Sequence, residues 1–249
     1  MKKNTLLASI LFLLLSAGAA KADDSNNAKA KFDSFTHGLS ELPADSVQGA
    51  VKKLMRSAEQ DREEYISLYN LATSAFFSTD SPMRDENCYI FFLQEVLNSG
   101  IPGEADRERA KFRMEMAMKN RPGTLAHDFA FITREGKESH LLESLQNKHT
   151  LLLFYDPDCG HCSDTIETLR HSPIPEWLSV VAIDPETDRA LWECSKDALP
   201  EEWTIGFAID PIQDDETYVF PEMPTLYLLD SKGTVILKEA TVNQILNFK

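Results

Sequence analysis

The chain has little cysteine, a shortage of positive charge, and no apolar stretch after its first 15 residues that is long enough to cross a membrane. Four cysteines among 249 residues are too few for a disulfide-held scaffold of this size. Only 25 lysines and arginines stand against 40 aspartates and glutamates, a formal net charge of -15. Such a chain repels phosphate backbones and anionic lipid headgroups, so we expect no nucleic-acid partner.

The first 22 residues are typical of a secretory signal peptide. Lys2 and Lys3 precede an apolar stretch from Leu6 to Leu15, and Ala20-Lys21-Ala22 fits the small-x-small cleavage rule. The stretch is shorter than the about 20 residues of a spanning helix, and no cysteine follows it for lipid attachment. Cleavage near Ala22 removes three lysines and no acid, which takes the net charge from -15 to -18. We expect an exported, periplasmic protein.

The remaining chain changes its pattern once, which predicts two domains. Residues 23–34 are small and polar and are expected to form a disordered leader. Residues 35–121 carry apolar side chains at helical spacing, which predicts an all-α domain. Residues 122–249 alternate short apolar runs with helical segments, which predicts an α/β domain with a central mixed sheet flanked by helices. We expect helices at residues 47–58, 65–76, 89–96, 104–119, 141–145, 163–170, 187–196 and 241–248, and strands at 129–133, 150–155, 178–183, 204–209, 225–229 and 234–238.

The motif Cys159-Gly160-His161-Cys162 carries the clearest chemical signal. A buried strand is expected before it and a helix after it, so the first sulfur lies at a helix N-terminus. The helix dipole and free backbone N–H groups favour the thiolate there, and thiolate is the form that attacks disulfides. Three other interpretations stay open: half a zinc site, an inert bridge or an inactive remnant. No second CxxC or spaced histidine pair completes four zinc ligands, and we expect no metal and no cofactor.

The order of these elements resembles the thioredoxin fold over residues 122–249. The likeness rests on a strand ending in CxxC, a βαβ crossover, and the dipeptide Met223-Pro224 at the start of the next-to-last strand. The closer likeness is to exported TlpA- and ResA-like proteins, which are related to the AhpC/TSA group. In those proteins an extra N-terminal hairpin precedes the core, and the segment from Gly123 to Phe129 of this chain looks like its entry. The helical half resembles a domain of unknown function that precedes such modules in some Gram-negative envelope proteins.

The resemblance implies a role for each residue of the motif. Cys159 would be the nucleophile and Cys162 the resolving thiol. Gly160 and His161 would tune the thiolate, with the imidazole stabilising it and making the disulfide more oxidising; otherwise His161 is a solvent-facing spacer. Met223 and Pro224 would bind substrate, with a cis peptide between them and the backbone of Met223 paired to the substrate strand. Cys-Gly-His-Cys also resembles the active site of protein disulfide isomerases.

Two departures from the family pattern bear on mechanism. Family members often have a buried acid six residues before the first cysteine, where this chain has Leu153. Asp156, Asp158 and Glu222 lie near in sequence and are candidates to replace it, or else solvated loop acids that raise the pKa of a neighbouring thiol. Peroxide-reducing relatives need a threonine or serine three residues before the reactive cysteine. Asp156 occupies that position, which argues against a peroxidase.

The sequence therefore predicts a periplasmic thiol–disulfide oxidoreductase, a reductase or an isomerase, with disulfide-containing proteins as substrates. The TlpA-like resemblance favours a reductase supplied by a membrane redox partner, whereas His161 favours an isomerase or mild oxidant. The alternative is a non-catalytic envelope module in which the helical domain binds a partner or forms a homodimer and the CxxC disulfide is incidental. Cys88 and Cys194 are interpreted as free, buried thiols, with a bond between them left open.

Overall fold

The computed structural model describes residues 27–248 except 79, 186–187 and 214–216, and it divides into two compact units. The first unit ends at Glu115 and the second begins at Met116, a few residues before the expected boundary after residue 121. The expected signal peptide lies outside the described residues. Among the helices that are described, none combines the length and the apolarity required to cross a bilayer.

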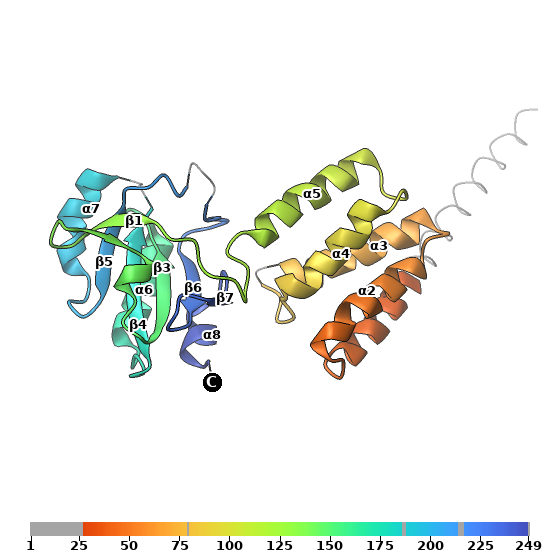
Figure 1. The fold of residues 1–249 in the computed structure, drawn as a ribbon, viewed down its shortest axis with the longest axis horizontal. Coiled ribbons are helices and arrows are strands. Elements are labelled where there is room, and N and C mark those ends of the chain that lie inside the picture. The colour runs from red at the N-terminus through yellow and green to blue at the C-terminus, as the bar shows by residue number, and fades with distance from the viewer. Residues whose placement is uncertain (1–26, 79, 186–187, 214–216, 249) are drawn as a thin grey trace, which may run out of the picture. The chain divides into compact units, whose positions relative to one another are not determined.

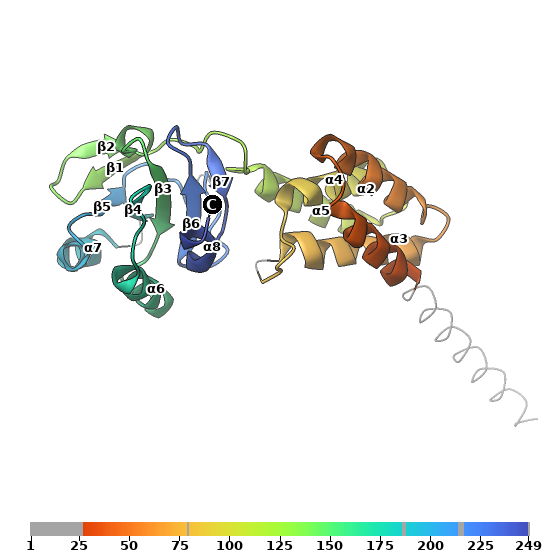
Figure 2. The same cartoon turned by 90° about the horizontal axis from the view of Figure 1, so that it is seen from below.

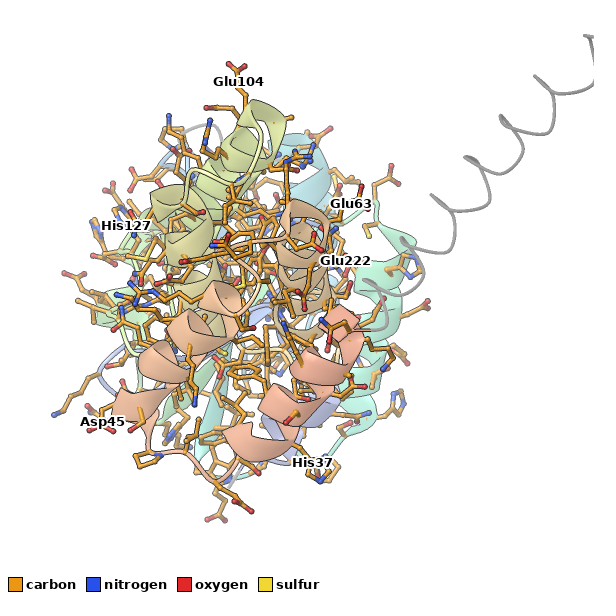
Figure 3. The ribbon with its side chains drawn as sticks, turned by 90° about the vertical axis from the view of Figure 1, so that its right-hand side faces the viewer. His37, Asp45, Glu63, Glu104, His127 and Glu222 are labelled. Carbon is orange, nitrogen blue, oxygen red and sulfur yellow. The ribbon has the colours of Figure 1, made fainter. Side chains whose placement is uncertain are left out.

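The first unit is built of helices, as its apolar periodicity predicts (Figure 1). Aspartates begin two of them: the Asp61 carboxylate accepts the N–H groups of Glu63 and Glu64, and Asp85 caps another. The exposed carboxylates Asp45 and Glu104 project away from the ribbon (Figure 3). The elements are a helix over residues 27–39, the 3₁₀-helix η1 Ala44–Ser46, α2 Val47–Arg56, α3 Arg62–Ala72, the π-helix η2 Thr73–Phe77, α4 Glu86–Asn98 and α5 Glu104–Met118, which runs past the unit boundary at its C-terminal end.

The prediction of a disordered leader is wrong from residue 27 onward. The helix over residues 27–39 buries Phe32, whose ring centroid lies 5.9 Å from that of Phe76 and 6.4 Å from that of Phe92. Its few apolar residues recur on one face, four, seven and eleven positions after Ala28, so a polar composition conceals an amphipathic helix. The segment therefore completes the core of the first unit.

The second unit contains a seven-stranded mixed sheet with the strand order β2-β1-β5-β4-β3-β6-β7. Strands β3, β4 and β5 are parallel neighbours, while β1, β6 and β7 join as antiparallel strands. The expected α/β class with a mixed sheet is confirmed. The strands are β1 Ala130–Thr133, β2 Glu138–His140, β3 His149–Phe154, β4 Leu178–Asp184, β5 Thr204–Ala208, β6 Thr225–Leu229 and β7 Val235–Leu237.

Helices α6 Gly160–His171, α7 Arg189–Ser195 and α8 Val242–Leu246 lie on one face of this sheet (Figure 2). Alternation along β3 sends Leu151 and Leu153 into the core beneath these helices and Leu152 and Phe154 into the core of the opposite face. Loops and the 3₁₀-helix η3 Leu142–Ser144 cover that second face. Because β3 lies between β4 and β6, its carboxyl end lies in the interior of the sheet and not at an edge.

Some expected elements differ in detail. The helix expected over residues 141–145 is the single turn η3, and the helix expected over 187–196 is α7 followed by the 3₁₀-helix η4 Lys196–Ala198. Residue 187 lies outside the described residues, and Asp188 caps α7 by accepting the N–H groups of Ala190 and Leu191. These shifts leave the positions of the strands, and with them the CxxC motif, unaffected.

Candidate active site

Cys159 is the N-cap residue of α6, directly above the end of β3. Asp156 folds the intervening turn: its carboxylate accepts the N–H of Asp158 at 2.8 Å, and its carbonyl accepts the N–H of Cys159 at 3.1 Å. The sulfur of Cys159 then accepts the N–H of Cys162 at 3.4 Å, in the place where a capping oxygen usually lies. The half-buried Cys159 sulfur thus lies at the positive end of the helix dipole.

Cys162 lies one turn inside α6 and is only 1% exposed. Burial above all, together with Cys159 and the charge of Asp156 and against a lowering by the Asp156 N–H, raises the pKa of its thiol to about 12. That N–H donates to the Cys162 sulfur at 3.4 Å. Both cysteines are free thiols. The motif therefore presents one reachable sulfur with a protonated sulfur hidden behind it.

The segment before β6 completes the site on the other side. The peptide between Met223 and Pro224 is cis, as the family resemblance implies. The Cys159 thiol donates to the carbonyl oxygen of Met223 at 3.6 Å. Met223 and Pro224 are both half-buried, and the Met223 side chain packs against the core clusters on both faces of the sheet. The structure thus brings Cys159, Cys162, Met223 and Pro224 together.

Gly160 and His161 lie in the same turn but point to solvent. Both are exposed, and a Cβ added at Gly160 would meet nothing within 4 Å. Across the described part of the chain, no hydrogen bond or ion pair is found for His161. Any influence of His161 on the Cys159 thiolate therefore acts through space and solvent, and its tuning role stays a prediction.

The acids near the motif fall into two groups. Asp158 and Glu222 are exposed, and Asp156 is half-buried in the turn described above. Leu153 is fully buried beneath α6, so no acid lies at that position. A different carboxylate, Asp184 at the end of β4, is also fully buried. Sequence analysis missed Asp184, although an acid ending an otherwise apolar strand was a visible signal.

The two remaining cysteines lie in different units and are both free. Cys88 is buried in α4, where burial and then the charge of Asp85 raise its pKa to about 12. Cys194 at the end of α7 is exposed, so the expectation that it is buried is wrong. No cluster of three or more potential metal-ligating side chains occurs in the described residues.

Comparison with known proteins assigns the chain to a family. Residues 20–120 match the family described as a domain of unknown function, DUF5106. A thioredoxin-like protein from Bacteroides caccae, of known crystal structure, is 31% identical, covers 87% of this chain and 79% of its own, and superposes with a TM-score of 0.73. This chain belongs to that thioredoxin-like family. The expected thioredoxin-like fold, with a helical domain of unknown function ahead of it, is confirmed.

A second relative of this thioredoxin-like protein covers about half of the chain. The C-terminal domain of an uncharacterized protein from Bacteroides fragilis is 32% identical over 52% of this chain and 97% of its own length, with a TM-score of 0.50. No curated protein matches the chain. The catalytic assignments therefore depend on the geometry of the site.

Proposed function

We propose that this thioredoxin-like protein is a thiol–disulfide oxidoreductase that reduces or isomerises disulfide bonds in protein substrates. The observation that carries the proposal is the asymmetric pair of free thiols at the start of α6. Cys159 is reachable and lies 3.6 Å from the Met223 carbonyl oxygen, whereas Cys162 is sealed directly behind it. One sulfur suits attack from solvent and the other suits an internal second step.

The exchange has two steps. The Cys159 thiolate attacks one sulfur of a substrate disulfide, a bond forms between them, and the other substrate sulfur leaves and takes a proton from water. Cys162 then loses its proton and attacks the Cys159 sulfur, which releases the second substrate sulfur. In reduction the substrate gains two electrons and two protons, and Cys159 and Cys162 become a disulfide. A further dithiol donor must reduce that disulfide before the next cycle.

The segment at Met223 supports protein substrates over small thiols. Its backbone borders the reactive sulfur and precedes β6, so an extended substrate segment could pair with it as an added strand. The Met223 side chain is flexible and half-buried, which suits apolar contact with varied sequences. We propose that substrate-binding role for Met223 and Pro224.

The cellular setting is part of the proposal. The expected signal peptide supports the proposal that the protein is exported to the periplasm, an oxidising compartment. A reductase there needs electrons from elsewhere, and we propose a membrane redox partner as the dithiol donor. An isomerase would instead gain from two sites in one particle, which a homodimer through the helical unit would provide.

A redox titration of the full chain tests the exchange chemistry. Cys194→Ser removes the exposed competing thiol, and alkylation followed by mass measurement counts free thiols across a series of glutathione ratios. We expect Cys159 and Cys162 to change together in one two-electron transition while Cys88 stays reduced. A pair that never oxidises, or never reduces once oxidised, contradicts the proposal and favours a binding module.

Substrate trapping tests the direction and the partners. Cys162→Ala should leave mixed disulfides on Cys159 in cells, and the double variant that also carries Cys159→Ala is the matched control. Proteins captured only by the single variant would be the substrates. An absence of covalent adducts, together with an unchanged phenotype for Cys159→Ala, would support the non-catalytic alternative.

A further inference from the structure

A cavity of about 210 Å³ opens beside the CxxC motif, between α6 and the 3₁₀-helix η4 that follows α7. Helices α6 and α7 lie on the same face of the sheet (Figure 2). The guanidinium of Arg170 on α6 joins the two sides of the cavity, because it donates to the carbonyl of Ala198 at 2.7 Å. All of the lining residues belong to the sheet unit, so the cavity is a feature of that unit alone.

The cavity borders the backbone of the reactive cysteine. Asp156 and Pro157 line it from the turn before Cys159, and Ser163 lines it from the first turn of α6. The N–H of Cys159 donates to the Asp156 carbonyl at 3.1 Å, and the Cys159 carbonyl accepts the N–H of Ser163 at 3.1 Å. The Ser163 hydroxyl donates to the same carbonyl at 3.3 Å. The walls of the cavity are therefore fixed to Cys159 itself.

This proximity places the cavity within reach of a substrate segment that is bound at Cys159. Ser163 lies about one helical turn along α6 from Cys159, and a turn rises about 5.4 Å. An extended chain advances about 3.3 Å per residue. A side chain one to three residues from the substrate cysteine can therefore enter the cavity while the two sulfurs meet.

The wall of the cavity is largely apolar. Tyr155, Ile166 and Leu199 line it, and each of these residues is at most 9% exposed. A hydrocarbon chain that lies against such a wall is removed from water, which stabilises the complex. Lysine and arginine bury their aliphatic stems in this way and keep the charged head at a polar rim. The shape and the lining therefore suit a long side chain with an aliphatic stem.

The rim of the cavity carries an unbalanced negative charge. Glu167 lies 3.7 Å from the guanidinium Nε of Arg170, so these two charges form a pair. Asp156 is half-buried, and its carboxylate accepts the N–H of Asp158. Within residues 27–248, outside the gaps given above, no cation forms an ion pair with Asp156. A fixed carboxylate at the edge of an apolar cavity favours a cationic group over a neutral or anionic one.

Resting on the thiol–disulfide exchange proposed above, we propose that this cavity is a specificity pocket for a lysine or arginine side chain of the substrate protein, one to three residues from the substrate cysteine. The aliphatic stem lies against Tyr155, Ile166 and Leu199. The cationic head lies against the Asp156 carboxylate. The contact forms before the mixed disulfide and holds the substrate sulfur near Cys159, so it determines which protein disulfides react fastest.

The test uses short peptides of glycine, serine and alanine with one cysteine, which is blocked as a mixed disulfide with a coloured aromatic thiol. One position, from three residues before the cysteine to three after it, holds lysine, methionine or glutamate. Methionine is unbranched like lysine but uncharged. Release of the aromatic thiol by the reduced full chain, in a Cys194→Ser background, gives a rate constant. Dividing it by the rate constant of the same peptide with 2-mercaptoethanol removes the intrinsic reactivity of the peptide.

We expect lysine to exceed methionine about fivefold at one or two positions, and glutamate to react slowest there. Asp156→Asn keeps an oxygen for the Asp158 N–H but removes the charge, so the ratio of lysine to methionine should fall close to one. Asp158→Asn removes an exposed carboxylate outside the lining and should keep most of the ratio. Ala198→Phe fills the cavity from an exposed position and should abolish the preference. Leu191→Phe, at an exposed site of α7 outside the lining, is its matched control.

The other outcomes separate the pocket from the exchange chemistry. Equal rates for lysine and methionine at every position would overturn the pocket and leave disulfide exchange intact. Equal losses of preference in Asp156→Asn and Asp158→Asn would also overturn it, since the preference would then be a general attraction to an acidic protein. So would a preference that a folded Ala198→Phe retains; if circular dichroism shows that this variant is unfolded, Asp156→Asn decides. Absence of thiol release by the parent chain, or an unchanged rate in Cys159→Ser, would instead refute exchange itself.

Discussion

Cys88 and Cys162 occupy matching positions in the two units of the molecule, yet only one of them belongs to a candidate active site. Each is the third residue of its helix, α4 or α6, and each donates its backbone N–H to the side chain of the N-cap residue. Burial raises the pKa of both thiols to about 12. A buried, protonated cysteine early in a helix is therefore common to both.

The difference lies in the residue that caps the helix. Asp85 caps α4 with a carboxylate oxygen 3.0 Å from the N–H, whereas Cys159 caps α6 with a sulfur at 3.4 Å. Sulfur is a weak acceptor, so α6 has a poorer cap but a reactive atom where the dipole favours an anion. The comparison teaches that the half-buried, reachable sulfur at the cap, and not the fully buried thiol, makes the site reactive.

The substitution with the largest expected effect removes Cys159, the reactive cap of α6. Cys159→Ser should reduce disulfide exchange to the uncatalysed rate, because a serine hydroxyl is not ionised at neutral pH and forms no disulfide. Cys88→Ser should leave the exchange rate unchanged. Reduction of a protein disulfide such as those of insulin, followed by turbidity, measures both. Equal losses for the two variants would show that the two helices are not functionally distinct.

A second prediction concerns what the two buried thiols share. A thiol that keeps its proton up to about pH 12 in the fold, but loses it near pH 9 when unfolded, stabilises the fold fully below pH 9. That stabilisation is lost as pH rises from 9 towards 12, and Cys88 should account for roughly 2 kcal/mol of lost stability by pH 10.5. Urea unfolding of the reduced chain between pH 7 and 10.5 measures it.

The corresponding control removes the titrating group. Cys88→Ser should show a shallower fall in the free energy of unfolding at alkaline pH than the parent, and Cys162→Ser should do the same for the sheet unit. A parallel pH dependence in parent and variant would mean that the folded thiol ionises as easily as the unfolded one. Burial would then not raise the pKa of that cysteine.

Asp85→Ala should sharpen the contrast between the two caps. Loss of a carboxylate cap costs about 1 kcal/mol of stability, whereas Cys159→Ala removes only a weak sulfur acceptor and should change the free energy of unfolding far less. Urea unfolding at pH 7, monitored by circular dichroism, compares them. A loss for Cys159→Ala as large as that for Asp85→Ala would show that the sulfur is a full structural cap.

The parts of this fold that sequence could predict are those set by local pattern. The strand before Cys159, the helix after it and the βαβ crossover all follow from runs of apolar residues and their periods. Residues 27–39 were missed because low overall hydrophobicity outweighed the helical spacing of Ala28 and Phe32. Composition is a poor guide where a few apolar residues share one face.

The candidate site also contains residues that the sequence predicts and features that depend on packing. Cys159, Cys162 and Pro224 were found because motif and strand order imply their proximity. The burial of Asp184 could not be predicted, because it depends on the neighbours of β4 in the folded sheet. The burial of Cys162 and the exposure of Cys194 likewise depend on packing that spacing does not encode.

The smallest expected effect tests whether His161, in the same turn as Cys159, changes the redox equilibrium of the Cys159–Cys162 disulfide. His161 is exposed and has no partner among the described residues, so its charge should act weakly on the Cys159 thiolate. His161→Ala should make the disulfide less oxidising, shifting its equilibrium with glutathione about threefold, as an exposed charge interaction of under 1 kcal/mol would. His171→Ala, at the far end of the same helix, is the matched control and should shift nothing. If both histidines change the equilibrium equally, the effect belongs to the net charge of α6 and not to the turn that distinguishes Cys162 from Cys88.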